Sequence, residues 1–145
     1  ILIGSEDPEC DERIFVDPDN WDENFTEQWK TQVLRQAQRY PNLPISNNVK
    51  GVVSLYDVTD DWIPIYDKSD LPGFYMAIGT SGNQFKNAPV AGVLMSELIE
   101  YCENGNNHDT EPLTINLKYI NKDINLKFYS RNRQINEESS MSVLG

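Results

Sequence analysis

The sequence predicts an α+β fold with two main helices and a mixed or antiparallel sheet. Three observations indicate this class: short apolar or alternating runs typical of strands, two longer stretches with helical apolar spacing, and a hairpin pattern near the C-terminus. The chain has 145 residues, which is enough for one domain with a modest core, and its 39% apolar content is typical of a globular protein.

The first 60 residues predict short strands and one helix. Residues 1–4 and 14–16 are short apolar runs bounded by turn-forming residues, and residues 49–58 are rich in β-branched side chains, so each of these segments predicts a strand. Residues 24–40 predict a helix, because apolar side chains recur on one helical face there. This face consists of Phe25, Trp29, Val33, Ala37 and Tyr40.

Two acidic segments could bind a metal, but local capping explains both more simply. Asp17 and Asp19 stand at the first and third positions of a calcium-loop pattern, yet Trp21 occupies the fifth, where an oxygen ligand is needed. We therefore favour a helix start for that segment. A second cluster could be a metal site or a general-acid pair, but it has no neighbouring histidine, and we favour a turn with solvated or capping carboxylates. That cluster comprises Asp57, Asp60 and Asp61.

Residues 73–101 are the centre of the predicted architecture. Residues 74–78 predict a buried strand, and residues 79–82 (GTSG) predict a small-residue turn. Residues 89–101 predict a helix. Free backbone N–H groups and the helix dipole at such a junction could cradle an anion or a cofactor. The expected apolar face of the helix comprises Val90, Val93, Leu94, Leu98 and Tyr101.

The last third of the chain predicts a hairpin. Residues 113–119 and 124–129 alternate apolar and polar side chains around the turn-forming sequence NKD. The single histidine, His108, lies in the polar loop before this hairpin, and we expect it at the surface rather than as a catalytic base. The two cysteines form no Cys-x-x-Cys pair, which argues against a disulfide framework or a zinc site and favours a reducing compartment.

Charge and missing motifs exclude several function classes. The net charge of −11 argues against a nucleic-acid partner. No apolar run approaches the roughly 20 residues that a membrane helix needs, so we expect no membrane partner and a cytoplasmic location. The sequence contains no phosphate-binding P-loop, no hydrolytic triad pattern and no GxGxxG fingerprint. The chain begins at Ile1 rather than Met, which suggests a fragment or a processed chain.

Residues 73–99 resemble the C-terminal flavin-contacting motif of the FAD-dependent amine and amino-acid oxidoreductases, the superfamily of D-amino-acid oxidase, glycine oxidase and sarcosine oxidase. The resemblance consists of a strand that ends in a Gly/Ser-rich turn, a Phe-Lys pair at residues 85–86 and an Ala-Pro helix start at residues 88–89. Other segments resemble family motifs in the same order, namely LIG at 2–4, RYPNLP at 39–44, LYDVTDDWIPI at 55–65 and, in some members, the tail from FYSRNR to VLG.

The resemblance implies that the chain is the C-terminal fragment of a two-domain FAD-dependent oxidoreductase. Residues 1–60 would be part of the substrate-binding domain, residues 61–110 the C-terminal part of the FAD-binding domain, and residues 111–145 a hairpin and tail. The whole enzyme would oxidise the C–N bond of a small-molecule amine or amino acid by hydride transfer to flavin. The N-terminal dinucleotide-binding half would be missing, so the fragment alone would be inactive. The alternative is a non-catalytic binding or interaction domain.

The resemblance also implies a set of site residues. Tyr56 and Lys86 would bind the substrate, with Lys86 facing a carboxylate, and no catalytic residue is assigned. FAD would be held non-covalently, because Ser54 stands where the sarcosine oxidase branch has its flavin-tethering cysteine. Two departures are notable: Asp60 replaces a proline, and residues 83–84 replace a frequent His-Gly pair. The implied cofactor contacts are Gly79, Thr80, Ser81, Gly82, Asn83, Gln84, Phe85 and Lys86.

Overall fold

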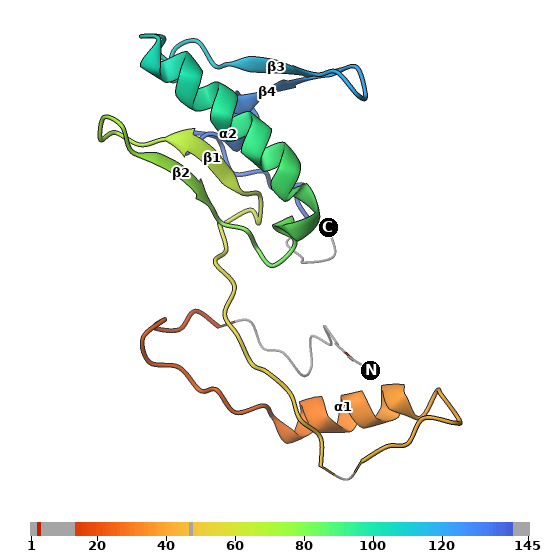
Figure 1. Cartoon of the computed structure of the whole chain (residues 1–145). Helices are drawn as coiled ribbons and strands as arrows, with labels where there is room; N and C mark the ends of the chain where they lie inside the picture. Colours follow the sequence, from red (N-terminus) through yellow and green to blue (C-terminus); the bar gives the residue numbers. More distant parts are fainter. Residues whose placement is uncertain (1–2, 4–13, 47, 141–145) are drawn as a thin grey trace. The chain divides into compact units, whose positions relative to one another are not determined.

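The computed structural model describes residue 3 and residues 14–46 and 48–140, and it divides the chain into two compact units (Figure 1). The units are Ile1–Leu55 and Tyr56–Gly145. The described residues contain two α-helices and two small antiparallel sheets, so the predicted α+β class is confirmed. None of the described helices is both long and apolar enough to cross a membrane. The division into family domains at residues 60 and 110 stays a prediction.

The first unit contains one helix, α1 (Glu27–Ala37). Its N-terminus is capped by Thr26, whose Oγ1 accepts a hydrogen bond of 3.1 Å from the backbone N–H of Trp29. Val33 and Ala37 are buried, so the predicted apolar face is correct at these positions. Tyr40 lies beyond the end of the helix and is exposed.

Two strands predicted for the first unit are wrong. Residues 14–16 and 49–58 form no strand, because a strand needs a neighbour that accepts and donates its backbone hydrogen bonds. In the described part of this unit, the one β-bridge joins Asp17 to Asn20 across a tight turn. The β-branched segment at 49–55 instead passes close to the ring of Trp29 at Gly51. The strand predicted at residues 1–4 lies outside the described residues, apart from Ile3, which is not in a strand.

The second unit begins with a β-hairpin formed by β1 (Ile65–Lys68) and β2 (Tyr75–Ile78). The strands are antiparallel, and their register pairs Ile65 with Ile78 and Lys68 with Tyr75. The strand predicted over 74–78 is therefore present, but its predicted burial is wrong, since Ile78 is 47% exposed. The reason is the small size of the sheet: β2 has a partner on one side only.

Helix α2 (Ala88–Glu103) follows and packs on β1 and β2. Proline stands in its first turn, and the helix ends before Gly105, whose φ is +87°. The predicted apolar face is only partly correct, because Val90 and Val93 are exposed while Leu94 and Leu98 are buried. The face that contacts the core is rotated relative to the prediction. It comprises Ala91, Leu94, Met95, Leu98 and Cys102.

The predicted second hairpin is confirmed as β3 (Thr114–Leu117) and β4 (Lys122–Asn125), which pair in antiparallel register. Asn121 has a φ of +50° in the connecting turn, a conformation that asparagine tolerates better than most residues. The turn predicted at NKD is misplaced, because Lys122 and Asp123 already belong to β4 and the turn occupies residues 118–121. The second strand also ends earlier than predicted, because residues after Asn125 form the 3₁₀ helix η2 (Leu126–Tyr129). The side chain of Asn125 caps this helix by accepting a hydrogen bond from the N–H of Lys127.

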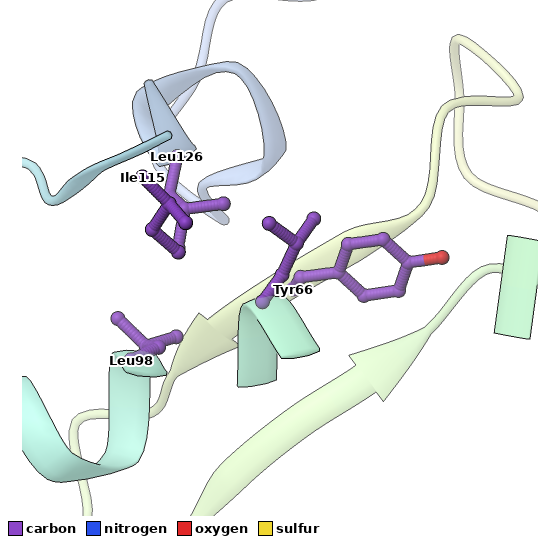
Figure 2. Close-up of a cluster of buried hydrophobic side chains, with 5 residues drawn as sticks. Tyr66, Leu98, Ile115 and Leu126 are labelled. Carbon is purple, nitrogen blue, oxygen red and sulfur yellow. The ribbon is translucent and has the colours of Figure 1, made fainter. Parts of the chain in front are cut away.

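The core of the second unit joins both hairpins to α2 (Figure 2). Its buried members come from β1, α2, β3 and η2, and they are Tyr66, Leu94, Leu98, Ile115 and Leu126. The rings of Tyr66 and Tyr129 lie 5.0 Å apart between their centroids. Because β1 and α2 both contribute to this core and β2 pairs with β1, the core anchors both ends of the segment between β2 and α2.

Candidate functional site

The segment Gly79–Asn87 connects β2 to α2 and contains all of the predicted cofactor contacts. Three of its residues have positive φ: Gly79 at +69°, Ser81 at +50° and Gly82 at +75°. These left-handed conformations let the chain reverse within four residues. The 3₁₀ helix η1 (Gln84–Asn87) then leads directly into α2.

Asp57 binds the first half of this turn. Its Oδ2 accepts hydrogen bonds from the N–H groups of Gly79 (2.8 Å) and Thr80 (3.1 Å), and its Oδ1 accepts one from the hydroxyl of Thr80. The N–H of Ser81 donates to the backbone oxygen of Asp57 at 3.0 Å. Partial burial raises the pKa of Asp57, but these hydrogen bonds outweigh it and leave the pKa below its usual value.

This pairing changes the expected role of the turn. The N–H groups of Gly79, Thr80 and Ser81 were expected to cradle an anion or cofactor, and they are instead occupied by Asp57. The side chain of Ser81 is fully buried, and its hydroxyl donates to the carbonyl of Gly79. In this arrangement the first three residues shape the turn, and any contact with a ligand falls to the residues after them.

Two glycines of the turn allow close approach of side chains from the 56–59 segment. A Cβ at Gly79 would lie 2.4 Å from Cγ2 of Thr59, and a Cβ at Gly82 would lie 2.6 Å from Cε1 of Tyr56. Tyr56, the predicted substrate residue, is 57% exposed beside the turn. The structure therefore brings Tyr56 next to the predicted cofactor-contacting residue Gly82.

The second half of the segment is more open to solvent. Phe85 is 97% exposed and Lys86 is also exposed, so both side chains are accessible to a ligand or a partner. Gln84 accepts hydrogen bonds on its Oε1 from the hydroxyl of Tyr66 (3.2 Å) and from Nδ2 of Asn87 (3.1 Å). Its own amide nitrogen donates to Asn83. The amide side chains are thus fixed while Phe85 and Lys86 extend into solvent.

A hollow of about 450 Å³ adjoins this second half. Its lining includes three amide residues, Asn83, Gln84 and Asn87, and three aromatic residues, Trp62, Phe128 and Tyr129. Such a lining suits a planar molecule with polar edges, because aromatic residues offer stacking and amides offer hydrogen bonds.

Asp57 and Asp61 of the acidic cluster at residues 57–61 accept hydrogen bonds from backbone N–H groups, as favoured from the sequence, but Asp61 is also part of a buried ion pair that was not expected. Asp61 is only 1% exposed, and its Oδ1 accepts hydrogen bonds from the hydroxyl of Thr59 and from the N–H of Ile63, both at 3.1 Å. Arg133 binds the same carboxylate through two nitrogens, Nε to Oδ2 at 3.0 Å and Nη2 to Oδ1 at 2.6 Å. Burial raises the pKa of Asp61, but Arg133 and the backbone donors hold it far below its usual value.

The expected surface position of His108 is wrong. His108 is 1% exposed, its Nδ1 accepts a hydrogen bond of 3.2 Å from the N–H of Leu113, and its Nε2 lies 3.8 Å from Oδ1 of the fully buried Asp67. Burial lowers the pKa of His108. The sequence could not show this, because Asp67 comes from β1 and is distant along the chain.

Arg131 links this buried pair to the surface. Its Nη1 donates to Asp67 at 3.1 Å and to Asp109 at 2.8 Å, and its Nη2 donates to Asp70 at 2.6 Å. Hydrogen bonds from Arg131 and Lys68 lower the pKa of Asp109 to about 2. Sequence reasoning assigned no partner to Arg131 or Arg133. Among the described residues, no group of three or more His, Cys, Asp or Glu side chains is placed to hold a metal.

Comparison with known proteins finds no match: no family model, no curated protein and no solved structure matches this chain. The family resemblance therefore rests on the sequence motifs alone.

Proposed function

We propose that this chain is the C-terminal part of an FAD-dependent oxidoreductase that oxidises the C–N bond of an amine or amino acid. The observation that carries the proposal is the contact between two motifs of the resemblance that are separate in the sequence. Residues 55–65 and 79–86 meet through Asp57, which binds Gly79 and Thr80, and through Tyr56, which lies against Gly82. Motifs that belong to one site are expected to lie together.

The residues of the turn fit a flavin in part. Gly79, Thr80 and Ser81 shape the turn through Asp57, whereas the stretch from Gly82 to Lys86 is the part that would contact the cofactor. Gly82 has a positive φ, and the absence of a side chain there lets the ring of Tyr56, the predicted substrate residue, lie against the start of this stretch. When bound, the flavin would accept a hydride from the carbon beside the amine.

Lys86 has the role of binding a substrate carboxylate in this proposal. Its ammonium is a point charge on a flexible stem, it is exposed, and it follows the turn directly. Tyr56 would line the substrate pocket beside it. The remaining partner is the dinucleotide-binding half, which would hold the ADP part of FAD and which this chain does not contain. We therefore expect the 145-residue chain alone to bind FAD weakly or not at all and to be inactive.

The test compares the protein encoded by the complete gene with the 145-residue chain. The complete protein should purify with flavin absorbance that bleaches on anaerobic addition of an amine or amino acid, and the short chain should show neither property. Oxygen consumption in the same assay separates an oxidase from a dehydrogenase. Absence of flavin from the complete protein, together with absence of a GxGxxG segment upstream of Ile1, would refute the proposal.

Lys86→Gln supplies a residue-level test in the complete protein. Loss of one charge-assisted hydrogen bond should raise KM for an amino-acid substrate by about 10- to 100-fold. Lys118→Gln is the matched control, because Lys118 is also an exposed lysine but lies in the turn of the second hairpin. An equal effect of both substitutions would contradict the role of Lys86.

The alternative function is a non-catalytic binding or interaction domain located in the cytoplasm. One observation favours it: Asp57 occupies the N–H groups of Gly79, Thr80 and Ser81, as expected of a purely structural turn. Under this alternative the exposed Phe85 would be a partner contact, and the complete protein would contain no flavin.

A further inference from the structure

The segment of residues 130–136, near the C-terminus, is attached to the turn at residues 59–63 by Arg133. The guanidinium binds both oxygens of Asp61, and its Nη2 also donates to the carbonyl of Ile63 at 2.7 Å. The N–H of Asn136 adds a further bond of 3.2 Å to Oδ2 of Asp61. Planar, two-point binding of a carboxylate by arginine is both strong and geometrically specific.

Asp61 in turn determines how Thr59 is oriented. The hydroxyl of Thr59 donates toward Oδ1 of Asp61 (3.1 Å) and toward the carbonyl of Ile63 (2.8 Å). With the hydroxyl held in this way, the methyl group of Thr59 faces Gly79, so closely that an added Cβ there would lie 2.4 Å away. The contacts therefore run without interruption from Arg133 through Asp61 and Thr59 to the first residue of the candidate cofactor turn.

Arg131 provides a natural comparison within the same segment. It is two residues before Arg133 and also binds buried and surface carboxylates, but these are Asp67, Asp70 and Asp109. The carboxylate that binds the turn at residues 79–82 is that of Asp57, not one of these three. Removing Arg131 would thus loosen the same segment without disturbing the contacts that lead to Gly79.

We infer that Arg133 is a positioning residue for the turn at residues 79–82, which it orders through Asp61 and Thr59. The consequence for flavin rests on the proposed function, whereas the consequence for the turn does not. Without Arg133, Asp61 is a buried carboxylate that has lost its cation, and such a group rearranges or becomes hydrated. One of the two acceptors of the Thr59 hydroxyl is then no longer fixed, and the other, the Ile63 carbonyl, loses its hydrogen bond from Arg133, so the methyl group that packs on Gly79 is held less firmly.

Hydrogen exchange in the 145-residue chain tests the effect on the turn. In Arg133→Gln, the amides of Gly79 and Thr80 should exchange at least about tenfold faster, the factor that corresponds to one lost charge-assisted hydrogen bond. The amides of Leu94 and Leu98 in α2 should change much less. A general loss of stability would accelerate both pairs, so their ratio isolates the positioning role.

Two further variants keep the inference falsifiable. Arg133→Lys retains the charge but cannot bind both carboxylate oxygens and the Ile63 carbonyl together, so it should give a smaller acceleration at the same amides. It also replaces Arg133→Gln as the main test if the latter does not fold. Arg131→Gln should leave the ratio unchanged. If Arg131→Gln and the Arg133 variants change the ratio equally, or if neither Arg133 variant changes it, the inference is overturned.

The effect of Arg133 on bound flavin is tested in the complete protein at saturating FAD. Arg133→Lys should shift the flavin absorbance maximum and reduction potential, and Arg131→Gln should leave both unchanged. If the turn amides exchange faster in the Arg133 variants, but neither the wild-type protein nor any variant contains flavin, the positioning role stands and the proposed function fails. If flavin is present but the Arg133 variants change neither the exchange rates of the turn amides nor the flavin reduction potential, the inference fails and the proposed function stands.

Discussion

Replacement of Gly79 by alanine gives the sharpest test of the turn, because two separate costs add at this position. The φ of Gly79 is +69°, a conformation that costs an L-residue about 1–2 kcal/mol. In addition, the new Cβ would lie 2.4 Å from Cγ2 of Thr59. Thr59 cannot simply rotate away, since its hydroxyl is bonded to Asp61 and to the carbonyl of Ile63.

The magnitude follows from these contacts. Rotation of Thr59 would break the hydrogen bond that its single hydroxyl proton shares between two acceptors, with a net value of about 1 kcal/mol, and relief by backbone movement costs about 1–3 kcal/mol. We expect Gly79→Ala to lower the free energy of unfolding of the second unit by about 3 kcal/mol. Gly73→Ala should cost only the backbone part, about 1–2 kcal/mol, because Gly73 has a φ of +76° but nothing within 4 Å of the added Cβ.

The assay is urea unfolding followed at the methyl signals of Leu94 and Leu98, which report on the second unit. A double-mutant cycle with Thr59→Ser removes the methyl group and keeps the hydroxyl, so the double variant should recover about 1–2 kcal/mol relative to additivity. The reasoning is refuted if Gly79→Ala costs no more than Gly73→Ala, or if the cycle shows no coupling between positions 59 and 79.

Three further outcomes are expected from the same unfolding assay. Burial holds the pKa of His108 below 6.5, so the unfolded chain binds the proton more tightly than the folded chain does. The free energy of unfolding should therefore fall as the pH decreases below 6.5. His108→Gln should make this pH dependence weaker when unfolding is measured from about pH 8 to pH 5. Asp67→Ala should destabilise by about 3 kcal/mol, because it removes the buried acceptor of the Ser130 hydroxyl and of the Arg131 N–H and one of the three carboxylates that bind the Arg131 guanidinium. Asp70→Ala, at an exposed carboxylate, should change little, and similar values for both would contradict this account of the network. Leu98→Ala, at a fully buried position, should cost about 3 kcal/mol, and a cost below that of Val93→Ala at an exposed position would show that the core is misassigned.

Local patterns in the sequence predicted the elements whose signals lie within a few residues. The strand at β2, the helix at α2 and the hairpin of β3 and β4 were all predicted, because alternation, helical spacing and turn residues act over short distances. The same reasoning identified the turn at residues 79–82, where positive φ values occur at both glycines.

Patterns failed where a segment had to find a distant partner. The β-branched run at residues 49–58 has the composition of a strand, yet strand formation needs a neighbouring strand, and this run has none among the described residues. Val90 and Val93 illustrate the same limit, because they are apolar and yet exposed. The position of the core on one side of α2 determines which apolar residues of the helix are buried.

The candidate site divides in the same way. The amino-acid sequence determined by itself the small-residue turn, the helix that follows it and the acidic residues at positions 57–61. Only the tertiary structure decided that Asp57 occupies the N–H groups of the turn, that Arg133 binds Asp61 and that His108 is buried against Asp67. These contacts join residues more than 20 positions apart, and hydrogen bonds and ion pairs depend on distances that only the folded chain sets.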